Sequence, residues 1–158
     1  LVSLRVTPAS REKDIVNWLG KQPEWTDFVP PVSLGQGKAI TASSQFDQPG
    51  YDARLANDGD SKTRWASDFA ARSGWLEMDL GVETEIGRVV VSEIEWPETR
   101  EFVIEIKQGD AWKEVARGTT IGAEKEISFA PLKARVIRLN VLRAERPVNI
   151  NEFQVFAP

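Results

Sequence analysis

The amino-acid sequence predicts an all-β protein, built as an antiparallel β-sandwich or β-barrel. From residue 33 onward, apolar and polar residues alternate with a period of two, the pattern of strands that bury one face. Turn residues separate these runs, and no long helical pattern stands between them. Short strands without intervening helices are typical of antiparallel sheets. Eight segments show the alternation: 38–43, 75–80, 86–96, 101–107, 111–116, 125–129, 134–142 and 148–156.

Individual segments support this interpretation. Leu76, Met78 and Leu80 alternate with acidic residues, so the three apolar side chains would share one face of a strand. The pair Gly109–Asp110 separates two alternating runs and predicts a tight hairpin turn. Pro147 stands just before the last run, where the missing N–H of a proline is tolerated.

The N-terminal part of the chain has a different pattern. Residues 2–6 alternate as a short strand would, and residues 11–19 carry apolar side chains at helical spacing between a capping serine and a glycine. Residues 21–31 contain three prolines and no clear period, which indicates a linker. We therefore expect two parts: an N-terminal strand–helix extension with a linker over residues 1–32, and a β-sandwich over residues 33–158.

Composition excludes several classes of function. The chain has no histidine and no cysteine, which rules out Ser-His-Asp and Cys-His nucleophiles and the usual zinc, iron–sulfur and haem ligands. A metal would have to be bound by oxygen atoms, which favours calcium or magnesium. The net charge of −4, without a cluster of lysine and arginine, argues against nucleic acid and membrane surfaces as partners.

Residues 44–74 are the long segment that does not alternate. They are rich in glycine, aspartate, serine and aromatic residues, and a loop of this length in a compact domain is usually functional. Asp58 and Asp60 lie two residues apart around Gly59, with Thr63 shortly after, so one tight loop could supply several oxygen ligands to calcium. Alternatively, the two aspartates only close a turn through Asx hydrogen bonds.

Several motifs, taken in order, resemble a known family. They are NDGDSKTRWAS at 57–67, GWLEMDLG at 74–81, IGRVVV at 86–91, ARVIRLN at 134–140 and INEFQVF at 150–156. This set is similar to the coagulation factor V/VIII C-type (discoidin) domain, whose superfamily includes family 32 carbohydrate-binding modules. The resemblance covers residues 33–158 and implies an eight-stranded antiparallel jelly-roll β-sandwich of the galactose-binding-domain-like type. Residues 108–113 and 118–122 further resemble the module appended to bacterial family 29 α-L-fucosidases and chitobiase-type enzymes.

The resemblance also implies a structural calcium ion that holds the long loop. In sugar-binding members of the family, this ion is tied to a glutamate of the last strand. The matching ligands here are a backbone carbonyl of Leu55 or Ala56, together with Asp58, Asp60, Thr63 and Glu152.

Sugar recognition would depend on loop residues. Sugars present apolar C–H faces and fixed hydroxyl groups, so their sites combine aromatic side chains with polar donors and acceptors. Trp65, Trp75 and Trp112 are expected to pack in the sandwich instead, and loop aromatics can also simply cover its end. The candidates that the period leaves in loops are Phe46, Tyr51, Phe69, Arg72, Trp96 and Arg100.

The resemblance implies a non-catalytic, carbohydrate-binding accessory module of a larger secreted or periplasmic bacterial glycoside hydrolase. Its partners would be a glycan or terminal monosaccharide, bound weakly by loops at one end, and the parent catalytic domain in the same chain. The alternative is a structural appendage that packs on the catalytic domain without binding sugar. The lack of histidine favours this alternative, as does the short loop between Trp96 and Arg100, because galactose-binding members use a loop histidine and an Arg–Asn pair.

Overall fold

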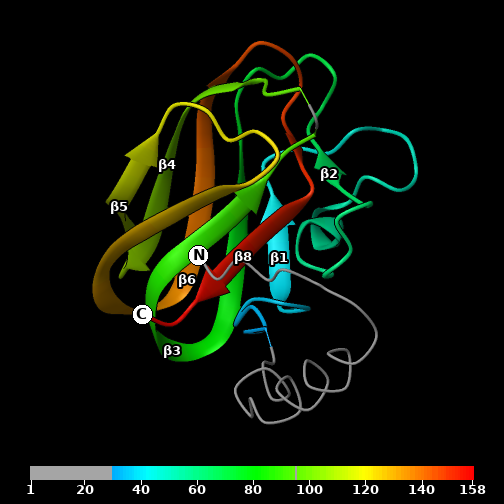
Figure 1. Ribbon diagram of the computed structural model, residues 1–158. Coiled ribbons are helices and arrows are strands. Elements are labelled where there is room, and N and C mark those ends of the chain that lie inside the picture. The colour runs from blue at the N-terminus through cyan, green and yellow to red at the C-terminus, as the bar shows by residue number, and fades with distance from the viewer. Residues whose placement is uncertain (1–29, 95) are drawn as a thin grey trace, which may run out of the picture. The chain divides into compact units, whose positions relative to one another are not determined.

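The computed structural model describes residues 30–94 and 96–158 (Figure 1). The predicted strand at 2–6, helix at 11–19 and linker at 21–31 lie outside the described residues or at their edge, so the division of the chain at residue 32 stays a prediction. No helix among the described residues is long and apolar enough to cross a membrane. The elements are β1 (Ala39–Ala42), the 3-10 helix η1 (Ala53–Ala56), β2 (Trp65–Ala66), β3 (Gly74–Ser92), β4 (Thr99–Gln108), β5 (Ala111–Gly118), β6 (Lys125–Ala144), β7 (Asn149–Ile150) and β8 (Glu152–Phe156).

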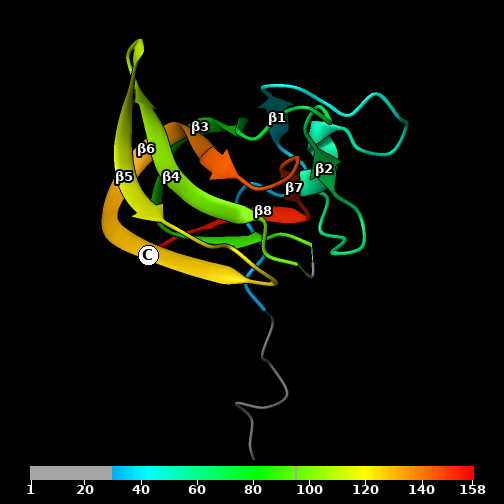
Figure 2. The same ribbon diagram turned by 90° about the horizontal axis from the view of Figure 1, so that it is seen from above.

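The strands form an antiparallel sandwich in which two long strands belong to both layers. The first layer has the order β1-β3-β6-β4-β5. Beyond their register shifts, the second half of β3 and the first half of β6 continue to pair with each other, and β8 pairs with that half of β3. Figures 1 and 2 show β3 and β6 curving from one layer into the other. A short sheet of β2 and β7 lies apart from this path. The predicted all-β, antiparallel sandwich is confirmed.

The strand boundaries differ from the predicted segments. Segment 75–80 and the first part of segment 86–96 belong to the single strand β3, which ends at Ser92, short of the predicted end, and segments 125–129 and 134–142 are parts of β6. The turn signals between them mark bends at which the register shifts and the ladder then resumes, as at a β-bulge. Segment 148–156 is divided into β7 and β8, and the alternation pattern predicts neither β2 nor η1.

The register shifts also explain how both halves of a bent strand face the core. In β3, Leu76, Met78 and Leu80 are buried at even positions, whereas Val89 and Val91 are buried at odd positions. The buried positions change from even to odd at Ile86 and Gly87, which are both buried, next to a register shift at which β3 advances two residues and β6 advances four. Both apolar sets therefore point inward. A strand of strict period two would expose one of these sets.

The three tryptophans expected in the core occupy two environments. Trp65 is fully buried, and its indole N–H donates to the carbonyl of Ser44 at 2.9 Å. Trp75 alternates with buried residues of β3, so it lies on the outer face of the first layer, and the half-buried Trp112 of β5 shares that face because Arg138 contacts both rings. There the guanidinium of Arg138 lies 3.7 Å from the centre of the Trp112 ring and 5.9 Å from that of Trp75. Cation–π packing, rather than core burial, covers these two rings.

Candidate functional site

Three loops from distant parts of the sequence meet at one end of the sandwich. They are residues 43–73 between β1 and β3, residues 93–98 between β3 and β4, and residues 145–148 between β6 and β7. Ser67 N donates to the carbonyl of Val148 and Val148 N donates to Ser67 Oγ, both at 2.9 Å. Because such bonds join the loops directly, their side chains form one continuous surface.

A hollow of about 270 Å³ opens between these loops. Three of the six residues predicted for sugar binding, Phe46, Tyr51 and Phe69, line it together. Such a cavity has room for a sugar ring, and aromatic side chains supply the apolar surface that a sugar face packs on. The lining residues are Phe46, Tyr51, Arg64, Ala66, Ser67, Phe69, Glu98, Arg146, Pro147 and Asn149.

Contacts among the lining residues hold the aromatic side of this hollow in place. Phe46 and Tyr51 pack edge to face, with ring centres 5.3 Å apart and planes at 82°. The guanidinium of Arg64 lies 5.0 Å from the centre of the Tyr51 ring, and its Nε donates to Asn149 Oδ1 at 3.2 Å. Phe69 remains 72% exposed. The hollow therefore combines a braced aromatic pair, an open aromatic ring and oriented polar groups.

The other three predicted residues lie outside this lining. Arg72 donates to the carbonyls of Phe69 and Ala71, at 3.1 and 2.9 Å, and so shapes its own loop. Arg100 forms an ion pair with Glu145 at 2.8 Å and donates to the carbonyl of Pro97 at 2.7 Å. Both guanidinium groups therefore join backbone segments.

Trp96 lines a neighbouring hollow of about 300 Å³ and is 73% exposed. Glu98 and Arg146 line both this hollow and the aromatic one, so they form the wall between the two. The Glu98 side chain is only 14% exposed, and burial raises its pKa above the ordinary value of 4.5, while Arg146 opposes this shift. A ligand that spans both hollows would cross this carboxylate–guanidinium pair.

The sequence did not single out Arg64, Glu98, Arg146 or Asn149 as candidates. Arg64 precedes β2 and Asn149 belongs to β7, and each of these strands has only two residues. The pairing of Ala66 with Asn149 brings the two segments together. A two-residue strand is too short to show alternation, so the sequence signal was only that a polar residue stands beside a buried one.

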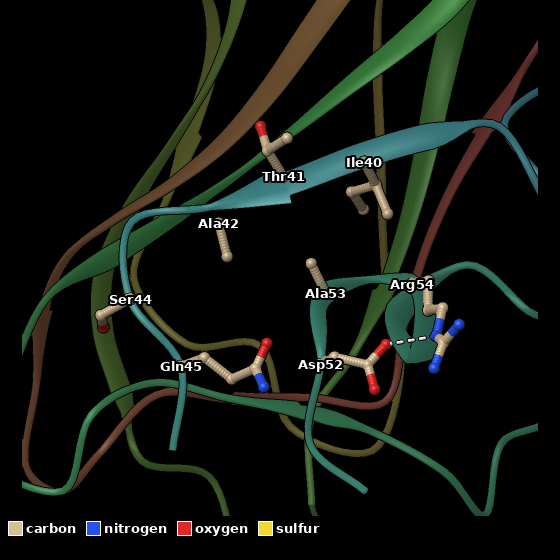
Figure 3. Close-up of a pocket in the computed structure, with 8 residues that line it drawn as sticks. All are labelled: Ile40, Thr41, Ala42, Ser44, Gln45, Asp52, Ala53 and Arg54. Carbon is tan, nitrogen blue, oxygen red and sulfur yellow. Dashed lines mark ion pairs between the residues drawn. The ribbon is translucent and has the colours of Figure 1, made fainter. Parts of the chain in front are cut away.

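A second and wider hollow, of about 650 Å³, lies on the other side of the long loop (Figure 3). In Figure 3, Gln45 and Asp52 lie across the hollow from Ile40 and Ala42 of β1, and Asp52 pairs with Arg54 at 2.6 Å. Among residues 30–94 and 96–158, no aromatic residue lines this hollow; its lining is Ile40, Thr41, Ala42, Ser44, Gln45, Asp52, Ala53 and Arg54. The neighbours of Gln45 and Asp52 in the chain, Phe46 and Tyr51, line the aromatic hollow instead. One loop thus separates the two cavities, and the aromatic one combines aromatic rings with polar and charged side chains.

Oxygen atoms crowd around the hydroxyl of Thr63. Thr63 Oγ1 lies 2.8 Å from Asp58 Oδ2, 2.9 Å from the carbonyl oxygen of Asp60 and 3.4 Å from that of Leu55. A hydroxyl has a single proton to donate, so three acceptors around it make an oxygen-rich pocket of the kind that a hard cation fills.

Glu152 adds a second carboxylate to this loop. It is 7% exposed, and its Oε1 accepts a hydrogen bond from Gly59 N at 3.0 Å. Burial and the adjacent Asp58 raise the pKa of Glu152 from 4.5 to about 7. The site would relieve this electrostatic cost if a cation lay between the two carboxylates.

The predicted calcium ligands are only partly brought together. Asp58, Thr63 and Glu152 lie at this loop, but the Asp60 carboxylate accepts from Lys62 N at 2.9 Å and only its carbonyl lies near Thr63. The nearby carbonyl of η1 is that of Leu55 rather than Ala56. No three acidic side chains gather among residues 30–94 and 96–158. The Asx hydrogen bond from Asp60 N to Asp58 Oδ1 (2.8 Å) is also present, so the turn closes without a metal.

The bent-strand antiparallel sandwich, with its aromatic hollow among the loops of one end, has the architecture of a galactose-binding-like β-domain. Residues 39–153 match the family model of the F5/8 type C domain, and the chain belongs to this family. None of the curated proteins is similar to the chain in sequence.

Solved structures give the same fold. Chitosan-binding module 1 from a chitosanase/glucanase of Paenibacillus sp. IK-5 is 27% identical, with a TM-score of 0.72 over 79% of this chain and 98% of that one. Module 2 of the same enzyme, in complex with chitotriose, is also 27% identical, with a TM-score of 0.72 over 78% and 99%. A GH29 fucosidase from Ruminococcus gnavus in complex with fucose is 24% identical, with a TM-score of 0.71 over 96% of this chain and 31% of that one.

Proposed function

We propose that this protein is a non-catalytic carbohydrate-binding module that binds terminal sugars weakly through the aromatic hollow. The observation that carries the proposal is the wall of Phe46, Tyr51 and Phe69 beside the oriented polar groups of Arg64 and Asn149. The similarity to two chitosan-binding modules at 27% identity supports it. Weak binding is useful in such a module because it raises the effective concentration of an attached enzyme at its glycan.

The lining of the hollow does not suggest hydrolysis. Glycoside hydrolysis uses two carboxyl groups across a cleft, separated by roughly 5–10 Å. Glu98 is the one carboxylate among the described lining residues, and it faces Arg146. We therefore assign the hollow to binding.

The proposed context is a larger glycoside hydrolase that acts outside the cytoplasm, at the cell envelope or beyond. The similar chitosan-binding modules derive from a chitosanase/glucanase, which supports the glycoside hydrolase part of this context. We propose that the parent enzyme is a fucosidase, on the resemblance of residues 108–113 and 118–122 to the module appended to such enzymes. Expressing the chain with its parent catalytic domain and measuring turnover on soluble and insoluble glycans would test this context.

We also propose a structural calcium ion at the loop of residues 55–63. Two carboxylates, one hydroxyl and two carbonyl oxygens form a hard oxygen donor set, which suits calcium better than magnesium because flexible, irregular coordination suffices. Asp58, Thr63 and Glu152 would hold the ion with the carbonyls of Leu55 and Asp60. The ion would fix the loop that leads into Arg64.

The second candidate function is the structural appendage. Arg72 and Arg100, two of the predicted ligand contacts, hold loop backbone instead of lining the aromatic hollow, which favours this alternative. The exposed rings of Phe69 and Trp96 would then pack on the parent domain.

Glycan-array screening and calorimetric titration of the purified chain distinguish these candidates. We expect at least one class of sugar to bind, with Phe46→Ala and Tyr51→Ala losing at least tenfold in affinity. Val82→Ala is the matched control, because Val82 is an exposed apolar residue (69%) outside the three loops. Blank arrays and no heat with any sugar would reject the binding module and leave the structural appendage.

A further inference from the structure

The aromatic hollow has a charge opposite to that of the protein. Among the lining residues that the structure describes, Arg64 and Arg146 stand against one carboxylate, that of Glu98, whereas the whole chain has a net charge of −4. Glu98 lies 3.7 Å from Arg146, so the charges of these two side chains cancel. Within the part of the chain that the structure describes, no carboxylate lies within ion-pair distance of Arg64. The surplus positive charge of the hollow is therefore that of Arg64.

The contacts of Arg64 orient its guanidinium without neutralising it. The group stacks over Tyr51, and its Nε donates to Asn149 Oδ1, while Asn149 Nδ2 donates to the carbonyl of Pro147 at 2.8 Å. All of these partners are uncharged. The two terminal nitrogens take part in no hydrogen bond with another described residue, so they form a donor fork for a ligand.

We propose that the aromatic hollow binds an anionic sugar, one that carries a carboxylate or a sulfate ester, and that Arg64 receives the anionic group. This inference rests on the proposed carbohydrate-binding function and names its ligand class. A planar guanidinium matches an oxyanion with two parallel hydrogen bonds, which a neutral hydroxyl cannot form. The exposed Phe69 ring and the Phe46–Tyr51 pair would pack against the apolar face of the same sugar.

The same arrangement disfavours a cationic sugar. A protonated amino group in the hollow would meet two guanidinium groups and one carboxylate that is already paired. The specificity of this domain would then differ from that of the similar modules, whose ligand is chitosan.

The test compares oligosaccharides of two or three sugar units by calorimetric titration of the full chain. The probes are trigalacturonic acid and sialyllactose for carboxylates, a sulfated disaccharide for sulfate, lactose and cellotriose as neutral sugars, and chitotriose as the amino sugar. We expect one anionic probe to bind at least tenfold more tightly than the neutral sugars at 50 mM salt, with a smaller margin at 500 mM.

Variants of Arg64 identify the responsible group. Arg64→Gln should lose at least tenfold in affinity for the anionic probe and less than threefold for any neutral sugar that binds, and Arg64→Lys should fall between the two. Arg117→Gln is the matched control, because Arg117 is a surface arginine paired with Glu114 on β5. Melting curves of each variant verify that it folds.

Three outcomes are decisive against the inference. Equal affinity for neutral and anionic sugars, preference for chitotriose, or an anionic preference that survives in Arg64→Gln would each overturn it while leaving the binding module intact. If no probe and no array glycan binds, the proposed function itself fails, which is a separate result.

Discussion

The sharpest test of the calcium proposal is Glu152→Gln, because calcium should reduce or reverse the stability difference between this variant and the wild type. The carboxylate of Glu152 is buried beside Asp58, which raises its pKa to about 7. A glutamine keeps the shape of the side chain, its oxygen still accepts from Gly59 N, and its amide can donate to Asp58. The substitution removes the negative charge of Glu152. Without calcium that charge destabilises the folded protein, whereas with calcium it is needed to hold the ion.

The magnitude follows from the shift of the pKa. The rise from 4.5 to about 7 corresponds to about 3 kcal/mol at about 1.4 kcal/mol per unit, and screening at the exposed loop reduces this to about 2 kcal/mol. Between pH 4.5 and 7 the unfolded chain releases the proton that the folded chain keeps, so stability falls as pH rises through this window. Above pH 7 the whole penalty is present.

The assay is thermal unfolding of the full chain in EDTA and in 10 mM calcium, at pH 5 and pH 8. At pH 8 in EDTA, Glu152→Gln should melt about 5–10 °C above the wild type, and at pH 5 the two should nearly coincide. Calcium at 10 to 100 times its dissociation constant adds about 1.4–2.7 kcal/mol to the wild type. The variant should gain little stability from calcium, so the difference between the two melting temperatures becomes smaller or changes sign.

The control is Glu83→Gln, which removes an exposed carboxylate from the bend of β3. It should follow the wild type under all four conditions. A Glu152→Gln variant that is less stable than the wild type in EDTA at pH 8 would refute the electrostatic reasoning. Equal stabilisation of wild type and variant by calcium would refute the ligand role of Glu152.

Three further changes test the site and the fold. Phe69→Ala should keep the melting temperature within about 2 °C of the wild-type value, because the ring is 72% exposed. In a titration, the same variant should bind sugar at least tenfold more weakly. Unchanged binding would show that Phe69 does not belong to the site. Asn57→Ala should cost about 2–4 kcal/mol in denaturant unfolding, since the buried Nδ2 donates to two backbone carbonyls at 2.7 and 3.0 Å; a loss below 1 kcal/mol would contradict this. Gly118→Ala should lower the free energy of unfolding by about 1–3 kcal/mol in the same measurement, because the added Cβ would lie 2.5 Å from Phe102 Cζ in the core. An unchanged free energy of unfolding would mean that Phe102 can move aside.

The sandwich could be predicted from the sequence because strands that bury one face alternate apolar and polar residues. Leu76, Met78 and Leu80 alternate with acidic residues over a half-buried strand, and the sequence reveals this without any knowledge of its partner. The bends of β3 and β6 could not be predicted in the same way. A residue such as Gly81, with φ of +88°, indicates that the backbone turns, but whether the ladder resumes afterwards depends on pairing with another strand.

The aromatic residues of the candidate site could be predicted from their residue type, but its polar residues could not. Phe46, Tyr51 and Phe69 stood out as large apolar residues in a polar loop, and they share one hollow. Arg64 and Asn149 are 85 positions apart and meet only because β2 pairs with β7. Conversely, Arg72 satisfies carbonyls of its own loop, a local contact that residue type alone does not reveal.

The order of residues along the chain links the two proposed sites. Thr63, at the centre of the oxygen cluster, is followed directly by Arg64, and Trp65 after it is locked into the core. Arg64 is therefore held between a buried tryptophan and a loop that two carboxylates border. A cation bound at Thr63 would restrict the backbone on one side of Arg64 as the core restricts it on the other. Calcium would then stabilise the orientation of the guanidinium without touching sugar, and by linkage an anionic sugar would tighten calcium binding by the same factor.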